Sequence, residues 1–269
     1  MNNQNFIKTP IIVIGMGELG SLFSNGFLRL GIPIIPILRS DNIKDFETIT
    51  PILVLIAVDI QDLNKVLDDV PKSWWNVIVL LQNELLPGNW NHLSIPFPSI
   101  VVVWLEKKKQ SLKIRSFSPE IVYSPNKDLG DLIELCLNKQ NIPTLRVAME
   151  DEILIEMVQK NLFNLTMNVM GLYLGENSTF NDLLNDKNYE IRNLVARECL
   201  SLQKAQLKDL KLSENEMITK MWNYMSLVPE MKCQGRYAKA RLDRAISTSK
   251  KYGIEVTQLE KIKIENQSN

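Results

Sequence analysis

The segment IIVIGMGELG, residues 11–20, passes from a strand pattern to a helix pattern through three glycines. Its first four residues are isoleucine or valine, which is typical of a buried β-strand. From residue 18 the spacing of apolar residues indicates a helix, and that helix ends at Gly31. The glycines therefore have the spacing G-x-G-x-x-G in a strand–turn–helix context.

Each of the three glycines meets a requirement of dinucleotide binding. Gly15 permits a tight turn, Gly17 lets the backbone approach a pyrophosphate, and Gly20 allows close packing of helix and strand. The N-terminus of the helix adds N–H donors for the phosphates. An ordinary structural turn is the alternative, because glycines also serve turns that bind nothing. We predict a dinucleotide site formed by Gly15, Met16, Gly17, Glu18, Leu19 and Gly20.

Strand and helix patterns alternate through the rest of the first half. Three further apolar runs are typical of buried strands, at residues 33–40, 51–58 and 76–83, and residues 59–70 have a helical pattern. Such alternation favours a parallel sheet with helices on both faces.

The pattern of residues changes near residue 149, where long amphipathic helical patterns replace the β-branched runs. They occupy residues 150–172, 188–206 and 235–253. We therefore predict the α/β class. A Rossmann-type dinucleotide-binding domain over residues 1–148 is followed by an all-helical C-terminal domain over residues 149–269, which carries the substrate and catalytic residues.

The overall composition argues against several kinds of partner. Lys and Arg together number 31, as do Asp and Glu, so no net field favours nucleic acid or a membrane surface. The opening MNNQNFIKTP lacks the basic start and apolar stretch of a signal peptide. No apolar run approaches the roughly 20 residues that a transmembrane helix needs. We therefore expect a cytoplasmic protein.

Cysteine and histidine offer little for chemistry. Cys136, Cys199 and Cys233 are far apart and lack metal-type spacing, so we expect reduced, structural thiols. His92 is the only histidine in the chain, which leaves almost nothing for a histidine-based triad or a metal site. We therefore predict no metal.

Arg39 ends the second predicted strand and bears on the choice of dinucleotide. NAD sites usually place an acidic residue there to accept from the ribose 2′-hydroxyl, whereas a guanidinium suits the 2′-phosphate of NADP. The strand ends in PILRS, so we predict NADP(H) as the cofactor, bound in part by Arg39. Two alternatives stay open, because Asp41 could accept from a hydroxyl and Arg39 could be an ordinary surface arginine.

A polar stripe crosses an otherwise apolar helical run at residues 156–171. Lys160, Asn164 and Asn168 recur every four positions, so they lie on one face of a helix. Reduction of a ketone by hydride needs a proton donor at the developing alkoxide and hydrogen bonds that orient the substrate. A partly desolvated lysine and two amides could supply them. The alternative is a helix whose polar face meets water.

The order of these features resembles the ketopantoate reductase (2-dehydropantoate 2-reductase) family over nearly the whole chain. The likeness covers the glycine turn, the arginine after the second strand, and the lysine followed at four-residue steps by two asparagines. The family also has an asparagine after the fourth strand, matched by Asn83 in LLQNE. The segment YMSLVPEM resembles the family's serine segment and places Ser226 at the serine that contacts substrate.

The resemblance implies NADPH-dependent reduction of 2-dehydropantoate to pantoate, a step of pantothenate and coenzyme A biosynthesis. Lys160 would be the general acid. Asn83, Asn164 and Ser226 would hold the substrate or the nicotinamide end of NADP(H), with Asn168 supporting them. A homodimer through the helical domain is compatible with the sequence, although no heptad pattern marks an interface.

Two features of the family's pattern are missing. Tyr237 stands where the family has a glutamate that binds substrate hydroxyls, and the stretch IAVDIQDL lacks the family's lysine after the third strand. Loss of such a contact often costs a few kcal/mol of transition-state stabilisation. The alternatives are therefore a non-catalytic relative that binds NADP(H) in a sensing or assembly role, and an enzyme with altered specificity.

Overall fold

The computed structural model describes residues 9–81, 84, 86–107, 114–116 and 118–267. The chain divides into two compact units, Met1–Glu156 and Met157–Asn269. The first unit contains a sheet with flanking helices and the second is helical, so the predicted α/β class with a helical C-terminal part is confirmed.

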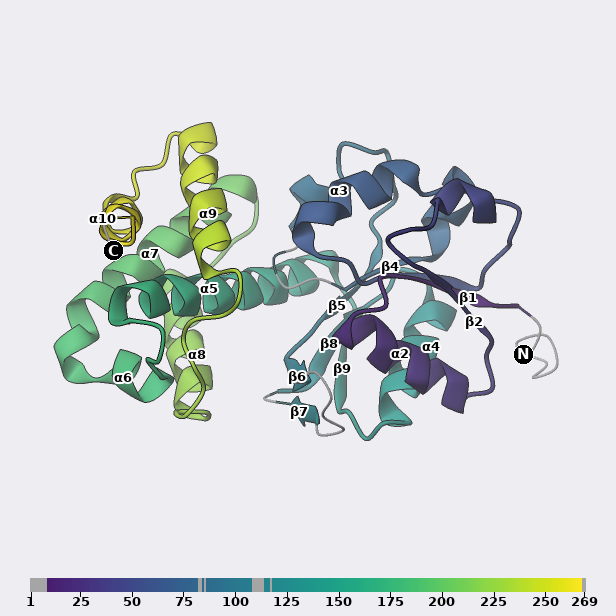
Figure 1. The fold of residues 1–269 in the computed structure, drawn as a ribbon, viewed down its shortest axis with the longest axis horizontal. Helices are drawn as coiled ribbons and strands as arrows, with labels where there is room; N and C mark the ends of the chain where they lie inside the picture. Colours follow the sequence, from purple (N-terminus) through teal and green to yellow (C-terminus); the bar gives the residue numbers. More distant parts are fainter. Residues whose placement is uncertain (1–8, 82–83, 85, 108–113, 117, 268–269) are drawn as a thin grey trace. The chain divides into compact units, whose positions relative to one another are not determined.

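The first unit is built on a seven-stranded sheet with the strand order β2-β1-β3-β4-β5-β8-β9 (Figure 1). Neighbouring strands are parallel, except β5 and β8, which pair antiparallel. Every residue of β1, β3, β4 and β5 is buried, which is why these strands are apolar runs in the sequence, interrupted only by Ser99 at the start of β5. The strands are β1 Ile11–Ile14, β2 Ile34–Ile37, β3 Leu53–Ile56, β4 Ile78–Leu81, β5 Ser99–Val102, β8 Glu120–Tyr123 and β9 Thr144–Val147. A separate antiparallel pair is formed by β6 Leu105–Lys107 and β7 Ile114–Ser116.

Helices cover both faces of this sheet, with α2 and α4 on one face and α3 on the other (Figure 1). Their bounds are α2 Glu18–Arg29, α3 Ile60–Asp69 and α4 Lys127–Asn138. Short 3₁₀ helices lie in the connections, η1 Ile43–Phe46, η2 Lys72–Val77 and η3 Pro87–Asn89.

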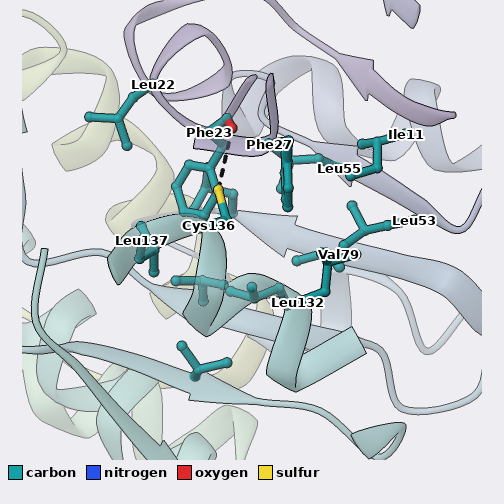
Figure 2. Close-up of a cluster of buried hydrophobic side chains, with 14 of the residues drawn as sticks. Ile11, Leu22, Phe23, Phe27, Leu53, Leu55, Val79, Leu132, Cys136 and Leu137 are labelled. Atoms are coloured by element: carbon teal, nitrogen blue, oxygen red, sulfur yellow. Dashed lines mark hydrogen bonds between the residues drawn. The ribbon is translucent and has the colours of Figure 1, made fainter. Parts of the chain in front are cut away.

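The contact between α2 and α4 is close because Gly26 has no side chain. A Cβ at Gly26 would lie 2.5 Å from the carbonyl oxygen of Cys136. The Cys136 thiol donates to the carbonyl of Phe23 at 3.3 Å and lies in the same apolar cluster as Phe27 (Figure 2). This packing fixes α2 on the sheet, and α2 is the helix that begins at the glycine turn.

The second unit gathers around α5, Glu150–Leu174, a helix that crosses the division between the two units. From Met157 to Leu172 nearly every side chain of α5 is buried, as expected of a helix surrounded by others. The remaining helices are α6 Phe180–Leu184, η4 Asp186–Asn188, α7 Tyr189–Gln206, α8 Glu214–Ser226, α9 Ala238–Tyr252 and α10 Thr257–Glu265. Helices α7, α9 and α10 pack against one another, and α8 packs against α6 and α7.

The cysteines are part of these cores. All three are buried and free. Burial raises the pKa of the Cys199 and Cys233 thiols to about 12. Among the described residues, no helix is both long and apolar enough to cross a membrane.

Candidate functional site

The glycine turn lies where the sequence places it, between β1 and α2. Gly15 has a φ of 95°, in the left-handed region that favours glycine. Its N–H donates to the carbonyl of Ile37 at 3.2 Å, and a Cβ there would lie 2.7 Å from the carbonyl oxygen of Ala57. Gly15 therefore lets the chain pass closely between the carboxyl ends of β2 and β3.

Gly20 and Gly17 have different surroundings. A Cβ at Gly20 would lie 1.9 Å from the carbonyl oxygen of Gly15, so no side chain fits there. A Cβ at Gly17 would meet no atom within 4 Å. Gly17 is also the N-cap of α2, and no side chain caps that helix. The first N–H groups of α2 therefore have no side-chain acceptor beside an open space, which is the arrangement that holds a phosphate.

A cavity of about 640 Å³ adjoins this turn, in the size range of small-molecule sites. Gly15, Met16 and Gly17 line it together with the segment after β2 and one side of α3 as far as its last residue, Asp69. The other residues predicted for this site, Glu18, Leu19 and Gly20, form the first turn of α2, where Glu18 is exposed and Leu19 packs against the core. The uncapped helix and the adjoining cavity fit the pyrophosphate and adenosine of a dinucleotide.

Arg39 lines the same cavity, and its guanidinium has a partner. Its Nη2 lies 2.6 Å from Oδ2 of Asp62, in the first turn of α3. Asp41 is engaged by its own turn, because its Oδ2 accepts from the N–H of Leu38 at 2.8 Å. Sequence reasoning missed Asp62. The only signal was an acidic residue in the first turn of the helix after β3.

The polar stripe of α5 is buried in the structure. Lys160 is 8% exposed, and its Nζ lies 5.4 Å from the centre of the Phe163 ring. Asn164 is 6% exposed. The alternative of a polar face that meets water is therefore wrong for these residues. A buried lysine on an apolar helix is uncommon unless its charge is satisfied or used.

Asn168 is wholly buried, and backbone groups occupy both ends of its amide. Its Oδ1 accepts from the N–H of Gly235 at 2.8 Å, and its Nδ2 donates to the carbonyl of Asn164 at 2.7 Å. Asn168 therefore ties α5 to the segment that leads into α9.

The remaining predicted residues lie elsewhere. Ser226 is exposed at the end of α8, and its hydroxyl donates to the carbonyl of Asn223 at 2.8 Å. Tyr237 is the N-cap residue of α9 and is 41% exposed. Asp243, the next acidic residue along α9, binds Lys263 at 2.6 Å. Asn83 lies outside the described residues.

The chain has the fold of several solved oxidoreductases. It matches a D-mandelate dehydrogenase in complex with NADH at a TM-score of 0.67 and 14% identity, over 97% of this chain and 99% of that one. It matches a probable 2-dehydropantoate 2-reductase from Bacillus subtilis at 0.68 and 14%, over 96% and 99%. A dimeric ketopantoate reductase from Staphylococcus aureus gives 0.66 and 16%, over 96% and 98%.

These matches cover at least 96% of each chain, so they include both the α/β and the helical units. The resemblance to the ketopantoate reductase family is thereby confirmed at the level of the fold. No protein-family model matches the sequence, and no curated protein matches it by sequence.

Proposed function

We propose that this chain is a nicotinamide-dependent reductase of a 2-oxo acid that uses NADPH. Its first candidate substrate is 2-dehydropantoate, whose reduction is a step of pantothenate biosynthesis. The observation that carries the proposal is the uncapped N-terminus of α2, which opens beside a nucleotide-sized cavity. Solved proteins of the same fold include 2-dehydropantoate 2-reductases and a D-mandelate dehydrogenase with NADH, which supports the same class of reaction.

The glycine turn holds the cofactor in this proposal. The backbone of Gly15, Met16 and Gly17 and the first N–H groups of α2 bind the pyrophosphate. Arg39 binds the adenosine ribose at its 2′ position. A bound nicotinamide would supply the hydride. Side chains of the protein would donate the proton and orient the substrate.

Lys160 supplies the proton. Hydride addition to a ketone leaves negative charge on the carbonyl oxygen, and a lysine ammonium at that oxygen stabilises the charge and donates the proton. Burial in an apolar helix strengthens this effect, because water does not screen the ammonium. Asn164 orients the substrate, and Asn168 holds the helix and the segment before α9 in place. Asn83 and Ser226 stay candidate contacts, and the Ser226 hydroxyl would have to leave the carbonyl of Asn223 to serve.

The test is the oxidation of NADPH in the presence of 2-dehydropantoate and a panel of 2-oxo acids that differ in size and hydroxylation. Turnover with at least one member is expected. Calorimetry with the cofactor alone and with each acid shows whether both components bind. Cofactor binding without turnover of any 2-oxo acid, and without tighter binding when an acid is added, would instead indicate a non-catalytic relative.

A second candidate is the reduction of a 2-oxo acid with fewer hydroxyl groups, or of a larger one. Tyr237 favours it, because this exposed phenol stands where a hydroxyl-binding carboxylate is expected, and Asp243 is already bound to Lys263. In that case Tyr237→Glu should raise kcat/KM for the hydroxylated substrate relative to its deoxy analogue by about tenfold, the worth of one charge-assisted hydrogen bond. Tyr237→Phe serves as the control and should not change that ratio.

A further inference from the structure

The cavity beside the glycine turn carries more acidic than basic side chains. Its lining includes the cations of Arg39 and Lys65. The acidic side chains of the lining are Asp41, Asp59, Asp62 and Asp69. A site made for a ribose 2′-phosphate would be expected to gather cations instead, because that group is close to doubly charged at neutral pH.

Three of these carboxylates are engaged away from Arg39. Asp41 accepts from the N–H of Leu38, and Asp59 accepts from the N–H of Gln61 as the N-cap of α3. The Oδ1 atom of Asp69 lies 3.9 Å from Nζ of Lys44. Asp62 is the carboxylate that meets the guanidinium of Arg39, at 2.6 Å.

We infer that Asp62 determines the nucleotide preference of this chain, an inference that rests on the proposed function. In this type of fold the segment that directly follows β2 meets the 2′ position of the adenosine ribose, and here that segment contains Arg39. A 2′-phosphate at Arg39 has to share the guanidinium with Asp62 and faces a like charge. A 2′-hydroxyl has no such conflict, because it can donate to a carboxylate. The chain therefore accepts NADH at an affinity close to that for NADPH, although it carries the arginine typical of NADP sites.

The ion pair itself does not block the site. The side chains of Arg39 and Asp62 are 88% and 43% exposed, and pairs between exposed side chains hold weakly. A phosphate can therefore draw the guanidinium away. The charge of Asp62 remains beside the phosphate after that movement, so the carboxylate lowers the preference for NADPH without abolishing its binding.

The experiment compares Asp62→Asn with the unmodified protein by calorimetry. The ligands are NADPH and NADH, together with adenosine 2′,5′-bisphosphate and AMP as probes of the adenosine end alone. In the unmodified protein the Kd values of NADPH and NADH should lie within about tenfold of each other. Asp62→Asn should tighten NADPH and the bisphosphate by about tenfold, equal to about 1.4 kcal/mol, and change NADH and AMP by less than about threefold.

Two control variants separate this effect from a general change of charge. Asp68→Asn makes the same substitution in the same helix, but Asp68 faces His92 at 3.5 Å and does not line the cavity. It should leave all four affinities unchanged. The double variant Arg39→Gln with Asp62→Asn should lose the gain, because the liberated guanidinium is then absent.

The inference is overturned if Asp62→Asn leaves the ratio of NADPH to NADH affinity within twofold of the unmodified protein, or if Asp68→Asn has the same effect. Binding of the adenosine probes without turnover of any 2-oxo acid would sink the proposed reaction while the preference set by Asp62 stands. Absence of binding by all four ligands would overturn both.

Discussion

Asn168 accepts a hydrogen bond from the backbone N–H of Gly235 at 2.8 Å, although 67 positions separate the two residues in the chain. The bond joins the buried face of α5 to the segment before α9, and Tyr237 lies two residues further on. It also leaves no room at Gly235, where a Cβ would lie 2.9 Å from Oδ1 of Asn168. Asn168, the third residue of the polar stripe, therefore stabilises the structure by linking α5 to the segment before α9.

Asn168→Ala should destabilise the protein by about 2 kcal/mol, because it leaves the half-buried N–H of Gly235 without its acceptor. Urea unfolding monitored by circular dichroism measures the change. Asn177→Ala is a suitable control, since the Asn177 side chain accepts only from Lys232 at an exposed position. A stability loss no larger than that of the control would show that the bond to Gly235 contributes nothing.

Gly17→Ala and Gly20→Ala should separate binding from folding. Ala at position 20 places a Cβ 1.9 Å from the carbonyl of Gly15, so we expect a loss of several kcal/mol of stability, comparable with severe overpacking at about 3 kcal/mol. Ala at position 17 meets open space and a permitted φ of −71°, so the loss should stay below about 1 kcal/mol.

The affinity for NADPH should nevertheless fall at least about tenfold in Gly17→Ala, because the new methyl group points into the space proposed for the pyrophosphate. Thermal unfolding and calorimetry check the two effects in parallel. An affinity for NADPH that is unchanged in Gly17→Ala would show that the pyrophosphate does not bind beside Gly17.

Because the thiols of Cys199 and Cys233 are buried, we expect the free energy of unfolding to fall at alkaline pH. The pKa of Cys199 and of Cys233 is about 12 in the folded chain, against an ordinary value of 9.0. Above the ordinary value the unfolded chain releases these protons while the folded chain keeps them. The stabilisation is therefore complete below pH 9 and is lost as the pH rises towards 12, by at most about 1.4 kcal/mol per pH unit for each thiol.

Urea unfolding at pH 7, 9, 10 and 11 tests this dependence. Tyr123 and other groups also titrate in this range, since burial raises the pKa of Tyr123 too. The comparison is therefore with the variant Cys199→Ala, Cys233→Ala. Its stability should fall less steeply with pH, and parallel curves for the two proteins would contradict the assignment.

Much of the fold was predictable from local patterns. Runs such as Leu53–Ile56 are buried along their whole length, so they appear in the sequence as continuous apolar segments. The requirement for a glycine with positive φ at position 15 follows from its place between a strand and a helix. Four-residue spacing likewise placed Lys160, Asn164 and Asn168 on one helix face.

Partners distant in sequence could not be predicted in this way. Spacing gives the face of a helix but not what covers it, so the bond from Asn168 to Gly235 and the pairing of Arg39 with Asp62 emerged only from the structure. Arg39 alone indicated NADP, whereas its acidic partner on α3 alters that interpretation. Ser226 was placed by resemblance, and its exposed hydroxyl is bound to its own helix.

In the proposed reaction Lys160 provides the proton for reduction of a 2-oxo acid. This role is tested by kcat with the best substrate, measured together with the Kd of NADPH. Lys160→Met keeps the apolar bulk and removes the ammonium. Lys220→Met is the matched control, because Lys220 also lies over an aromatic ring, that of Tyr224, at 5.8 Å. In Lys160→Met kcat should fall at least about 100-fold, as expected for loss of a general acid, while the Kd of NADPH stays within about twofold. A kcat within about threefold of that of Lys220→Met would show that Lys160 is not the general acid.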